Sequence, residues 1–407
     1  MQHQRAACKS ESIGSAEGVT RVSLFYDISD WAFHNVAQNI ERVAPVPYIV
    51  DLIARDDWFG VPGKPDQILA NSDLAVFLWR FDLLVFLDSL SNTSWRQLMT
   101  EPRCAFVTLV YDHVYCEERD LRTHGNPFVV ADCIGASSSR LCQLYCTAEH
   151  LPEIAHCVSD GVDTELFSPN SMEMPVAGRS LRIGWVGNSD WGITLGHDFK
   201  GTRTIFEPAL NLLRSSGLAF SVHLADKAER QLPRAAMPDF YRNVDVLVCS
   251  SLFEGTPNPV LEAMASGCAI VSTDVGIVPD IFGPTQMQFL MQERSAHALA
   301  TALERLIREP ETLAALKHEN LQRRETLDWH TRWPAWHSLF EEARANALTR
   351  QGATQGLAAF RIRPKTRAER IRKTIATNRA AFQGYSLLLE RWPGLIRWSK
   401  RLLALGS

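Results

Sequence analysis

The stretch from Val244 to Val275 constrains the fold of this chain more than any other. It begins and ends with short apolar runs rich in β-branched residues, 244–250 and 269–275, which are typical of buried strands in a parallel sheet. Residues 259–265 between them have the composition of a helix, and Gly267 is placed to end that helix in the left-handed conformation. Strand, helix and strand in this order predict a parallel βαβ unit.

The loop before this helix is predicted to bind an oxygen-rich ligand. Asn258 is a good N-cap and Pro259 suits the first helical position. The loop would then lie at the carboxyl end of the first strand, where open parallel sheets bind ligands. Backbone N–H groups at a helix N-terminus suit phosphate, carboxylate or sugar hydroxyl oxygens. The predicted free donors belong to Thr256, Val260 and Leu261.

Two carboxylates flank the same loop. Glu254 lies within it, and Glu262 is predicted to fall in the first helical turn. For an isolated pair the ordinary interpretation is a solvated loop residue and a carboxylate favoured by the helix dipole. The residues around the pair favour a functional role for both carboxylates instead.

Strands and helices alternate on both sides of this stretch. Further apolar runs predict strands at 21–27, 48–53, 105–110, 131–137, 181–187 and 220–225. This alternation predicts an α/β chain with two doubly wound, Rossmann-like parallel sheets. The predicted organisation is a flexible lead-in at 1–20, a first domain at 21–160, a linker at 161–180, a second domain at 181–328, a helical segment at 329–350 and a basic tail at 351–407.

Composition and cysteine usage favour a globular protein of the cytoplasm. Of the 407 residues, 46% are hydrophobic and 22% charged, and no apolar run is long enough to span a bilayer. The nine Cys show no disulfide framework, and Cys249 and Cys268 are predicted core residues. Cys142 and Cys146, near two His, fit either a metal site or a buried helix face, and the helix face is favoured because no second Cys pair completes a metal site.

Charge is distributed unevenly along the chain. Residues 361–407 carry twelve Arg and Lys against two Glu, whereas the whole chain has a formal net charge of −4. Leu395, Trp398, Leu402 and Leu405 fall on one face of a predicted helix with basic residues beside it. This pattern favours a peripheral helix on an anionic membrane at its inner face, and packing on the acidic body is the alternative. The apolar residues argue against a nucleic-acid-binding arm.

Four segments resemble known sequences. The string SSLFEGTPNPVLEAMASGCAIVSTDVGIVPDIF at 250–282 closely resembles the donor-binding segment of the retaining GT-B glycosyltransferases of family 4, the glycosyl transferases group 1. Residues 159–169 resemble the segment that joins the two domains of that family, and Lys200-Gly201 resembles a Lys-Gly pair that contacts the donor diphosphate. Residues 327–347 resemble its last helix, which crosses back onto the first domain. Trp329, Trp333 and Trp336 there are interpreted as packing residues.

The resemblance implies two Rossmann-like domains facing each other across a cleft. It implies transfer of a sugar from a UDP- or GDP-linked donor with retention of configuration, without a cofactor or metal. Glu262 would hydrogen-bond the nucleotide ribose, Glu254 would hold the donor sugar, and Lys200 would neutralise the diphosphate leaving group. The implied donor-binding set is Gly187, Asn188, Lys200, Arg203, Glu254, Gly255, Thr256, Asn258, Val260 and Glu262.

The chain departs from the family pattern at several positions, among them a longer loop from Asn188 to Asp198 and the order Asp112-His113 where the family usually has His-Asp. Family members usually carry an Arg where this chain has Asn188, and Arg203 is a candidate for the missing charge. Many also have a Gly-rich loop after the first strand, where this chain reads DISDWAFHN. His113, at the end of a predicted strand, is a candidate catalytic residue together with Glu254 and Lys200. A structural His whose hydrogen bonds are satisfied at the strand end fits equally. Asp30 and His34 are candidates on the acceptor side.

The acceptor and the exact activity stay open at this point. A lipid-linked or polysaccharide acceptor in bacterial-type cell-surface glycan synthesis is expected. A non-catalytic nucleotide-sugar-binding or scaffold protein is the alternative, supported by Asn188 and the missing Gly-rich loop. A phosphorylase would consume inorganic phosphate, and an epimerase would interconvert sugars without an acceptor.

Overall fold

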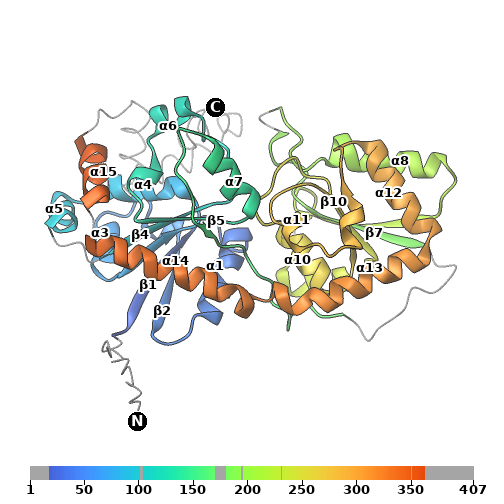
Figure 1. Cartoon of the computed structure of the whole chain (residues 1–407), viewed down its shortest axis with the longest axis horizontal. Helices are drawn as coiled ribbons and strands as arrows, with labels where there is room; N and C mark the ends of the chain where they lie inside the picture. Colours follow the sequence, from blue (N-terminus) through green and yellow to red (C-terminus); the bar gives the residue numbers. More distant parts are fainter. Residues whose placement is uncertain are drawn as a thin grey trace, which may run out of the picture.

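Two parallel sheets organise the molecule (Figure 1). The computed structural model describes residues 18–100, 104–169, 180–193, 196–230, 232–349 and 351–362, with the side chains of 351–355 and 362 left out. The prediction of two Rossmann-like parallel sheets is confirmed. Residues 1–17 of the predicted lead-in and 363–407 of the predicted basic tail lie outside the described residues, whereas Thr20 of the predicted lead-in begins β1.

The first sheet has the strand order β2-β1-β3-β4-β5-β6, and every pair in it is parallel. Its strands are β1 (Thr20–Tyr26), β2 (Tyr48–Ala54), β3 (Leu74–Phe77), β4 (Ala105–Val110), β5 (Cys133–Ala136) and β6 (His156–Cys157). The helices between them are α1 (Ala32–Val43), α2 (Arg55–Trp58), α3 (Lys64–Ala70), α4 (Arg80–Ser89), α5 (Asn92–Thr100), α6 (Glu118–His124), the 3-10 helix η1 (Pro127–Val129) and α7 (Ser139–Thr147).

The second sheet has the order β11-β10-β9-β7-β8 and is also parallel. Its strands are β7 (Leu181–Gly187), β8 (Phe220–Asp226), β9 (Val246–Cys249), β10 (Ala269–Thr273) and β11 (Leu290–Met291). Its helical elements are η3 (Thr202–Phe206), α8 (Glu207–Ser215), η4 (Arg234–Ala236), α9 (Met237–Arg242), α10 (Asn258–Ala265), α11 (Val278–Ile281), η5 (Gln286–Phe289), α12 (Ala296–Arg308), α13 (Pro310–Arg323) and η6 (Arg324–Leu327).

The central strands β3, β4 and β9 are apolar at every position except Thr108, because helices cover both faces of each sheet. All residues of β3, β4 and β9 are buried. On the first sheet, one face packs against α1 and the other against α4 and α5. On the second sheet, α8 and α12 cover one face, and α9, α10 and α11 cover the other.

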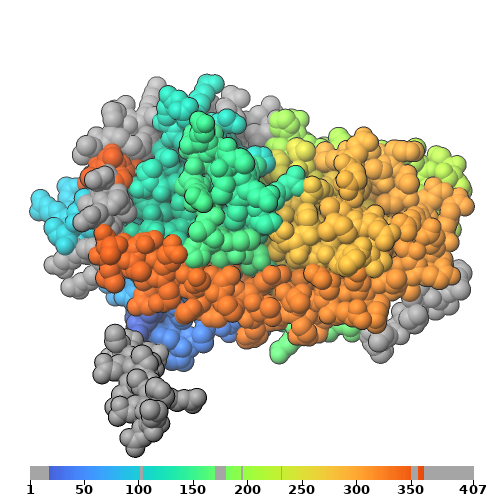
Figure 2. Space-filling view, viewed as in Figure 1, coloured from blue at the N-terminus to red at the C-terminus, as the bar shows by residue number. Residues whose placement is uncertain are grey.

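Helix α14 (Trp329–Thr349) leaves the second domain and packs on the first. In Figures 1 and 2, α13 and α14 form an orange band along the lower edge of both domains. The side chains of Trp336, Leu339 and Phe340 are fully buried in the same core as β1, β3 and β4. Trp329 is buried as well, so its predicted packing role is confirmed, as it is for Trp336.

The two segments that join the domains run side by side. Val162 donates its N–H to the carbonyl of Leu327, and Trp329 returns one to the carbonyl of Val162. A Cβ on Gly161 would overlap the backbone of Trp329, so the close approach requires glycine. Asp160, next to it, is buried and accepts a hydrogen bond of 2.7 Å from the Tyr111 hydroxyl.

Asp160 gives the fold a predicted pH dependence. Burial raises the pKa of Asp160 from 3.8 to about 7, against the opposing effects of Tyr111 and Arg332. Between these two values the unfolded chain has lost a proton that the folded chain retains. The free energy of unfolding should therefore fall as pH rises from about 4 to about 7, by about 1.4 kcal/mol per unit of pKa shift, and then level off.

Urea unfolding of the wild type and of Asp160→Asn at several pH values in this range measures the effect. Asparagine stays neutral and can still accept from Tyr111, so the variant should lack this part of the pH dependence. Parallel pH profiles for the two proteins would contradict the assignment.

The start of the predicted tail packs on the body. Helix α15 (Gln351–Ile362) places Leu357 and Phe360 in the core beneath α4 and α5, and Arg361 lies over the Trp95 ring. The basic, apolar segment that favoured a membrane surface is otherwise outside the described residues. Within the described part, no helix is both long and apolar enough to cross a membrane.

Candidate functional site

A cavity of about 1540 Å³ lies between the two sheets. On the first-domain side it is lined by Asp27 after β1 and Asp112 after β4. On the second-domain side it is lined by Gly187 at the end of β7 and Ser250 after β9. The carboxyl ends of both sheets therefore face one cleft, which is where such sheets bind ligands.

Lys200 and Glu254 form an ion pair in this cleft. The Lys200 Nζ lies 2.5 Å from Glu254 Oε1, and the Ser251 hydroxyl donates to the same oxygen at 2.7 Å. Burial acts to lower the pKa of Lys200, but the carboxylate of Glu254 outweighs it and the pKa is raised. The ammonium group therefore stays charged, with donors left for a second anion.

The loop that carries Lys200 is held against the end of β9. The Ser250 hydroxyl donates to the Lys200 carbonyl at 2.8 Å, and Arg294 donates to the Ser250 carbonyl at 3.0 Å. Gly201 has a φ of +71°, and a Cβ there would overlap the Ser250 carbonyl oxygen. Only glycine fits both constraints, so Gly201 sets the position of Lys200.

Gly201→Ala is expected to destabilise the second domain by more than about 2 kcal/mol. A left-handed backbone costs alanine about 1–2 kcal/mol, and the overlap with Ser250 adds to this. Gly217→Ala is the matched control, since Gly217 has the same φ of +71° with nothing within 4 Å of its Cβ position. Urea unfolding checks the difference, and equal losses in the two variants would contradict the role given to Ser250.

Glu262 is buried at the floor of the cleft. One carboxylate oxygen lies 3.1 Å from Arg234 Nη1, and the other accepts from the Tyr241 hydroxyl at 2.8 Å. Burial raises the pKa of Glu262, opposed by Arg234 and by the Tyr241 hydrogen bond. Arg234 also lines the cavity, so Glu262 and Arg234 form a polar pair beside the first turn of α10.

The start of α10 differs from the prediction. The helix begins at Asn258, Pro257 is the capping residue, and no side chain makes a cap hydrogen bond. The prediction of Asn258 as the N-cap is therefore wrong, and Glu262 lies in the second turn rather than the first. The N–H of Val260 donates to the Pro257 carbonyl at 2.8 Å, so it is not a free donor. Thr256, Asn258, Val260 and Glu262 still line the cleft, whereas Leu261, the remaining predicted donor, does not.

Gly255 and Thr256 bring the domains into contact. The Thr256 hydroxyl donates to the Ser137 carbonyl at 3.2 Å. A Cβ on Gly255 would overlap the Tyr111 carbonyl oxygen and the Ser137 hydroxyl of the first domain. The loop of Glu254 is thus fixed by the first domain as well as by its own sheet.

The cavity wall carries residues of both domains that no motif indicated. Asp27 lies at its base, with a pKa raised by burial. Trp31 precedes α1, and its ring centroid lies 3.4 Å from the Nζ of Lys227 across the cleft. Lys227 follows β8, and its N–H donates to the Gly187 carbonyl at 2.9 Å. The only sequence signal for Lys227 was its place at the end of the predicted strand 220–225.

Two candidates lie off the cavity wall. Arg203 forms an exposed ion pair of 2.8 Å with Asp190 and does not line the cavity. His113 is exposed, and its ring centroid lies 5.5 Å from that of Phe253, which does line the cavity. Its neighbour Asp112 also lines the cavity and lies 2.9 Å from the fully buried Arg80.

The acceptor-side candidates are joined to each other. The N–H of Asp30 donates to His34 Nδ1 at 2.9 Å, and the His34 ring stacks on Tyr26. Asp30 lines the cavity, as does Asn188, whereas His34 lies behind that wall. The structure therefore gathers the donor-side residues tightly but brings only part of the acceptor-side set to the cleft.

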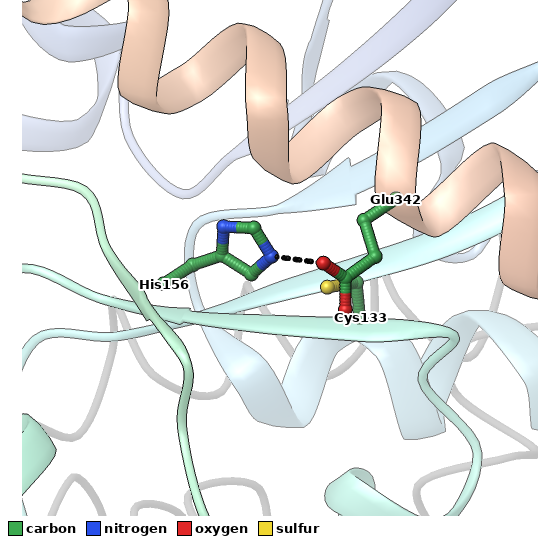
Figure 3. A group of neighbouring side chains, drawn as sticks. All are labelled: Cys133, His156 and Glu342. Carbon is green, nitrogen blue, oxygen red and sulfur yellow. Dashed lines mark hydrogen bonds and ion pairs between the residues drawn. The ribbon is translucent and has the colours of Figure 1, made fainter.

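One cysteine and one histidine lie together with a glutamate away from the cleft. Cys133, His156 and Glu342 place one candidate ligand atom each within 4.8 Å of one another, the one such group among the described residues. Figure 3 shows His156 from β6 pointing at Glu342 from α14, with Nε2 and Oε2 2.8 Å apart. Burial raises the pKa of Cys133 to about 12, so its thiol keeps its proton at neutral pH.

This trio joins α14 to the first sheet, and none of its members lines the cavity. Cys249 and Cys268 are buried, which confirms them as core residues. Cys146 is exposed and Cys142 is half-buried, so the predicted buried helix face for this pair is wrong.

Comparisons with known proteins agree with this geometry. Residues 228–323 match the model of the family described as glycosyl transferases group 1. A 206-residue segment is 26% identical to an MMP alpha-(1->4)-mannosyltransferase of Mycolicibacterium hassiacum, covering 47% of this chain and 49% of that protein. Over 75 residues the chain is 39% identical to TuaC of Bacillus subtilis, a putative teichuronic acid biosynthesis glycosyltransferase, covering 18% and 19%. The chain thus spans half or less of the curated relatives it matches.

Solved structures share the fold. HepE of Anabaena in complex with UDP superposes with a TM-score of 0.59 at 13% identity, covering 79% of this chain and 100% of that one. A sucrose-phosphate synthase of Thermosynechococcus elongatus superposes with a TM-score of 0.57 at 14% identity, covering 80% and 99%. At these identities the likeness establishes the two-domain GT-B fold.

Proposed function

We propose that the chain is a member of the glycosyl transferases group 1 family, and that it transfers a sugar from a nucleoside diphosphate sugar to a glycan or lipid-linked acceptor, with retention of configuration. The observation that carries this proposal is the meeting of Lys200, Glu254, Glu262 and the first turn of α10 on the wall of one interdomain cavity. A cavity of about 1540 Å³ has room for a nucleotide sugar together with part of an acceptor.

Each donor-side residue has a task in this proposal. Glu262, with Arg234 beside it, binds the ribose hydroxyls at the floor of the cleft. Glu254 and the backbone after it, from Gly255 to Asn258, hold the donor sugar. Gly187 and Asn188, at the end of β7, line the side of the cleft next to the phosphates.

Lys200 supports the chemical step. As the bond between the sugar and the diphosphate breaks, negative charge builds on the phosphate oxygens. A fixed ammonium group and a helix N-terminus placed there before the reaction lower the barrier without reorganising. Because this chain supplies that positive potential itself, the proposed reaction needs no bound metal.

The acceptor site is proposed for the first-domain wall. Asp27 and Asp30 line it with oxygen acceptors for sugar hydroxyls, and His113 approaches through its contact with Phe253. UDP is bound by a protein of the same fold, and UDP is therefore the first donor nucleotide to test, with GDP as the second. Relatives named as a putative teichuronic acid biosynthesis glycosyltransferase and an MMP alpha-(1->4)-mannosyltransferase support a glycan acceptor in general terms only.

Nucleotide binding followed by turnover tests the proposal. The full chain should show a raised thermal midpoint with UDP or GDP, because a ligand of the folded state stabilises it. It should then release the same nucleoside diphosphate from the matching nucleotide sugar, even slowly to water. A thermal shift without any release would favour the non-catalytic binding protein, and no shift with any nucleotide or nucleotide sugar would overturn the donor site.

A further inference from the structure

The cleft contains four Arg or Lys side chains in its described lining: Arg55, Lys200, Lys227 and Arg234. Three of them are paired with carboxylates. Arg55 lies 3.4 Å from Asp82, Lys200 2.5 Å from Glu254, and Arg234 3.1 Å from Glu262. Among the described residues, Lys227 alone in this set has no carboxylate within ion-pair distance.

Lys227 is held at the place where the two sheets face each other. Its backbone N–H donates to the carbonyl of Gly187, so it adjoins Asn188 at the carboxyl edge of the second sheet. Its side chain reaches across the cleft to the first domain, where Nζ lies 3.4 Å from the Trp31 ring centroid. The position is therefore fixed from both sides of the cavity.

The contact with Trp31 leaves the charge of Lys227 incompletely compensated. A cation over an aromatic face generally gains less than a cation that donates a hydrogen bond to an anion. Burial lowers the pKa of Lys227, while Asp27 and Asp30 act from a distance to raise it. An anion that entered the cleft would therefore gain more from this ammonium group than Trp31 does.

We propose that Lys227 binds the diphosphate of the donor, as a second cation opposite Lys200. This inference rests on the proposed function and deepens it. Asn188 brings no charge to this edge of the sheet, and Arg203 is committed to Asp190 outside the cavity. Lys227 is the remaining cation next to Asn188, and its side chain spans the space between the two domains.

Paired ligands with and without phosphate test this role. The dissociation constants of UDP and uridine, or of GDP and guanosine if GDP is the nucleotide that binds, are measured by calorimetry for the wild type and for Lys227→Met. The variant should bind the diphosphate about 10- to 100-fold more weakly, because it lacks one charged hydrogen bond. Its affinity for the nucleoside should stay within about threefold of the wild type.

Two further variants control the experiment. Lys227→Arg keeps a phosphate-binding cation and should recover most of the lost affinity. Arg230→Met removes a positive charge from the same loop, but Arg230 is exposed and does not line the cavity. It should bind the diphosphate as the wild type does, and the ligand-free thermal midpoints of all variants should agree with that of the wild type.

The outcomes separate this inference from the proposed function. A wild type that binds neither diphosphate would overturn the donor site as a whole. A wild type that binds one would keep the site, and the inference would then fail if Lys227→Met bound the diphosphate normally. It would fail equally if the variant lost as much affinity for the nucleoside as for the diphosphate.

Discussion

Lys200→Ala is expected to lower the turnover of the proposed transfer by about 10²- to 10³-fold, the cost typical of losing one fixed group that stabilises charge in a transition state. The backbone of Lys200 is held against the residue after β9 by Ser250 and Gly201, and its ammonium group pairs with Glu254 in the loop before α10. The substitution also leaves the Glu254 carboxylate without its cation, so that an uncompensated negative charge remains near the proposed leaving group. Steady-state kinetics with the donor identified by binding measure the loss.

A mutant cycle separates the two effects. Glu254→Gln alone, Lys200→Ala alone and the double variant should be strongly non-additive, because the two side chains are 2.5 Å apart and share one ion pair. Arg230→Met is again the control for a change of net charge. Turnover of Lys200→Ala within fivefold of the wild type would remove Lys200 from the catalytic set.

Glu262→Ala is expected to weaken nucleotide binding by about 100-fold, since a carboxylate that accepts two ribose hydrogen bonds is worth about 3 kcal/mol. The same change leaves Arg234 and the Tyr241 hydroxyl without their common partner. A loss of stability of about 1–3 kcal/mol should accompany it, as expected for buried polar groups that lose their hydrogen bonds.

A nucleotide without ribose hydroxyls isolates the binding effect. The wild type should bind a 2′,3′-dideoxynucleoside diphosphate weakly, and Glu262→Ala should bind it no more weakly than that. Tyr241→Phe is the control, because it removes a hydrogen bond to Glu262 without removing the carboxylate. If Glu262→Ala discriminated between the two nucleotides as the wild type does, the ribose assignment would be wrong.

The second domain was the more predictable half of the molecule. Its central strands β9 and β10 are short, buried on both faces and separated by clear turn residues, so apolar runs such as 244–250 located them well. The position of the ligand-binding loop could then be predicted, because open parallel sheets bind ligands at the carboxyl ends of their strands. The helix boundary was less accurate: a capping role was assigned to Asn258 from its residue type, whereas the chain enters α10 through Pro257 without any side-chain cap.

Contacts between distant side chains could not be read from local patterns. The ion pair of Lys200 and Glu254 joins residues on two separate loops, and nothing in either loop indicates the other. The approach of Lys227 to Trp31 depends on how the two domains face each other. That arrangement is set by interdomain contacts such as Thr256 to Ser137, which have no periodicity in sequence.

Helix α14 has a consequence for how this protein is made. It packs beside α1 on one face of the first sheet, over β3, β4 and β5, yet it is synthesised roughly 200 residues after β4, so these contacts are very non-local. At a translation rate of 5–20 residues per second, one face of the first sheet therefore stays exposed for roughly 10–40 s before α14 has been synthesised. The first domain cannot complete its fold before the second has been translated, and the bare face of β3 and β4 is the surface that a chaperone would meet in that interval.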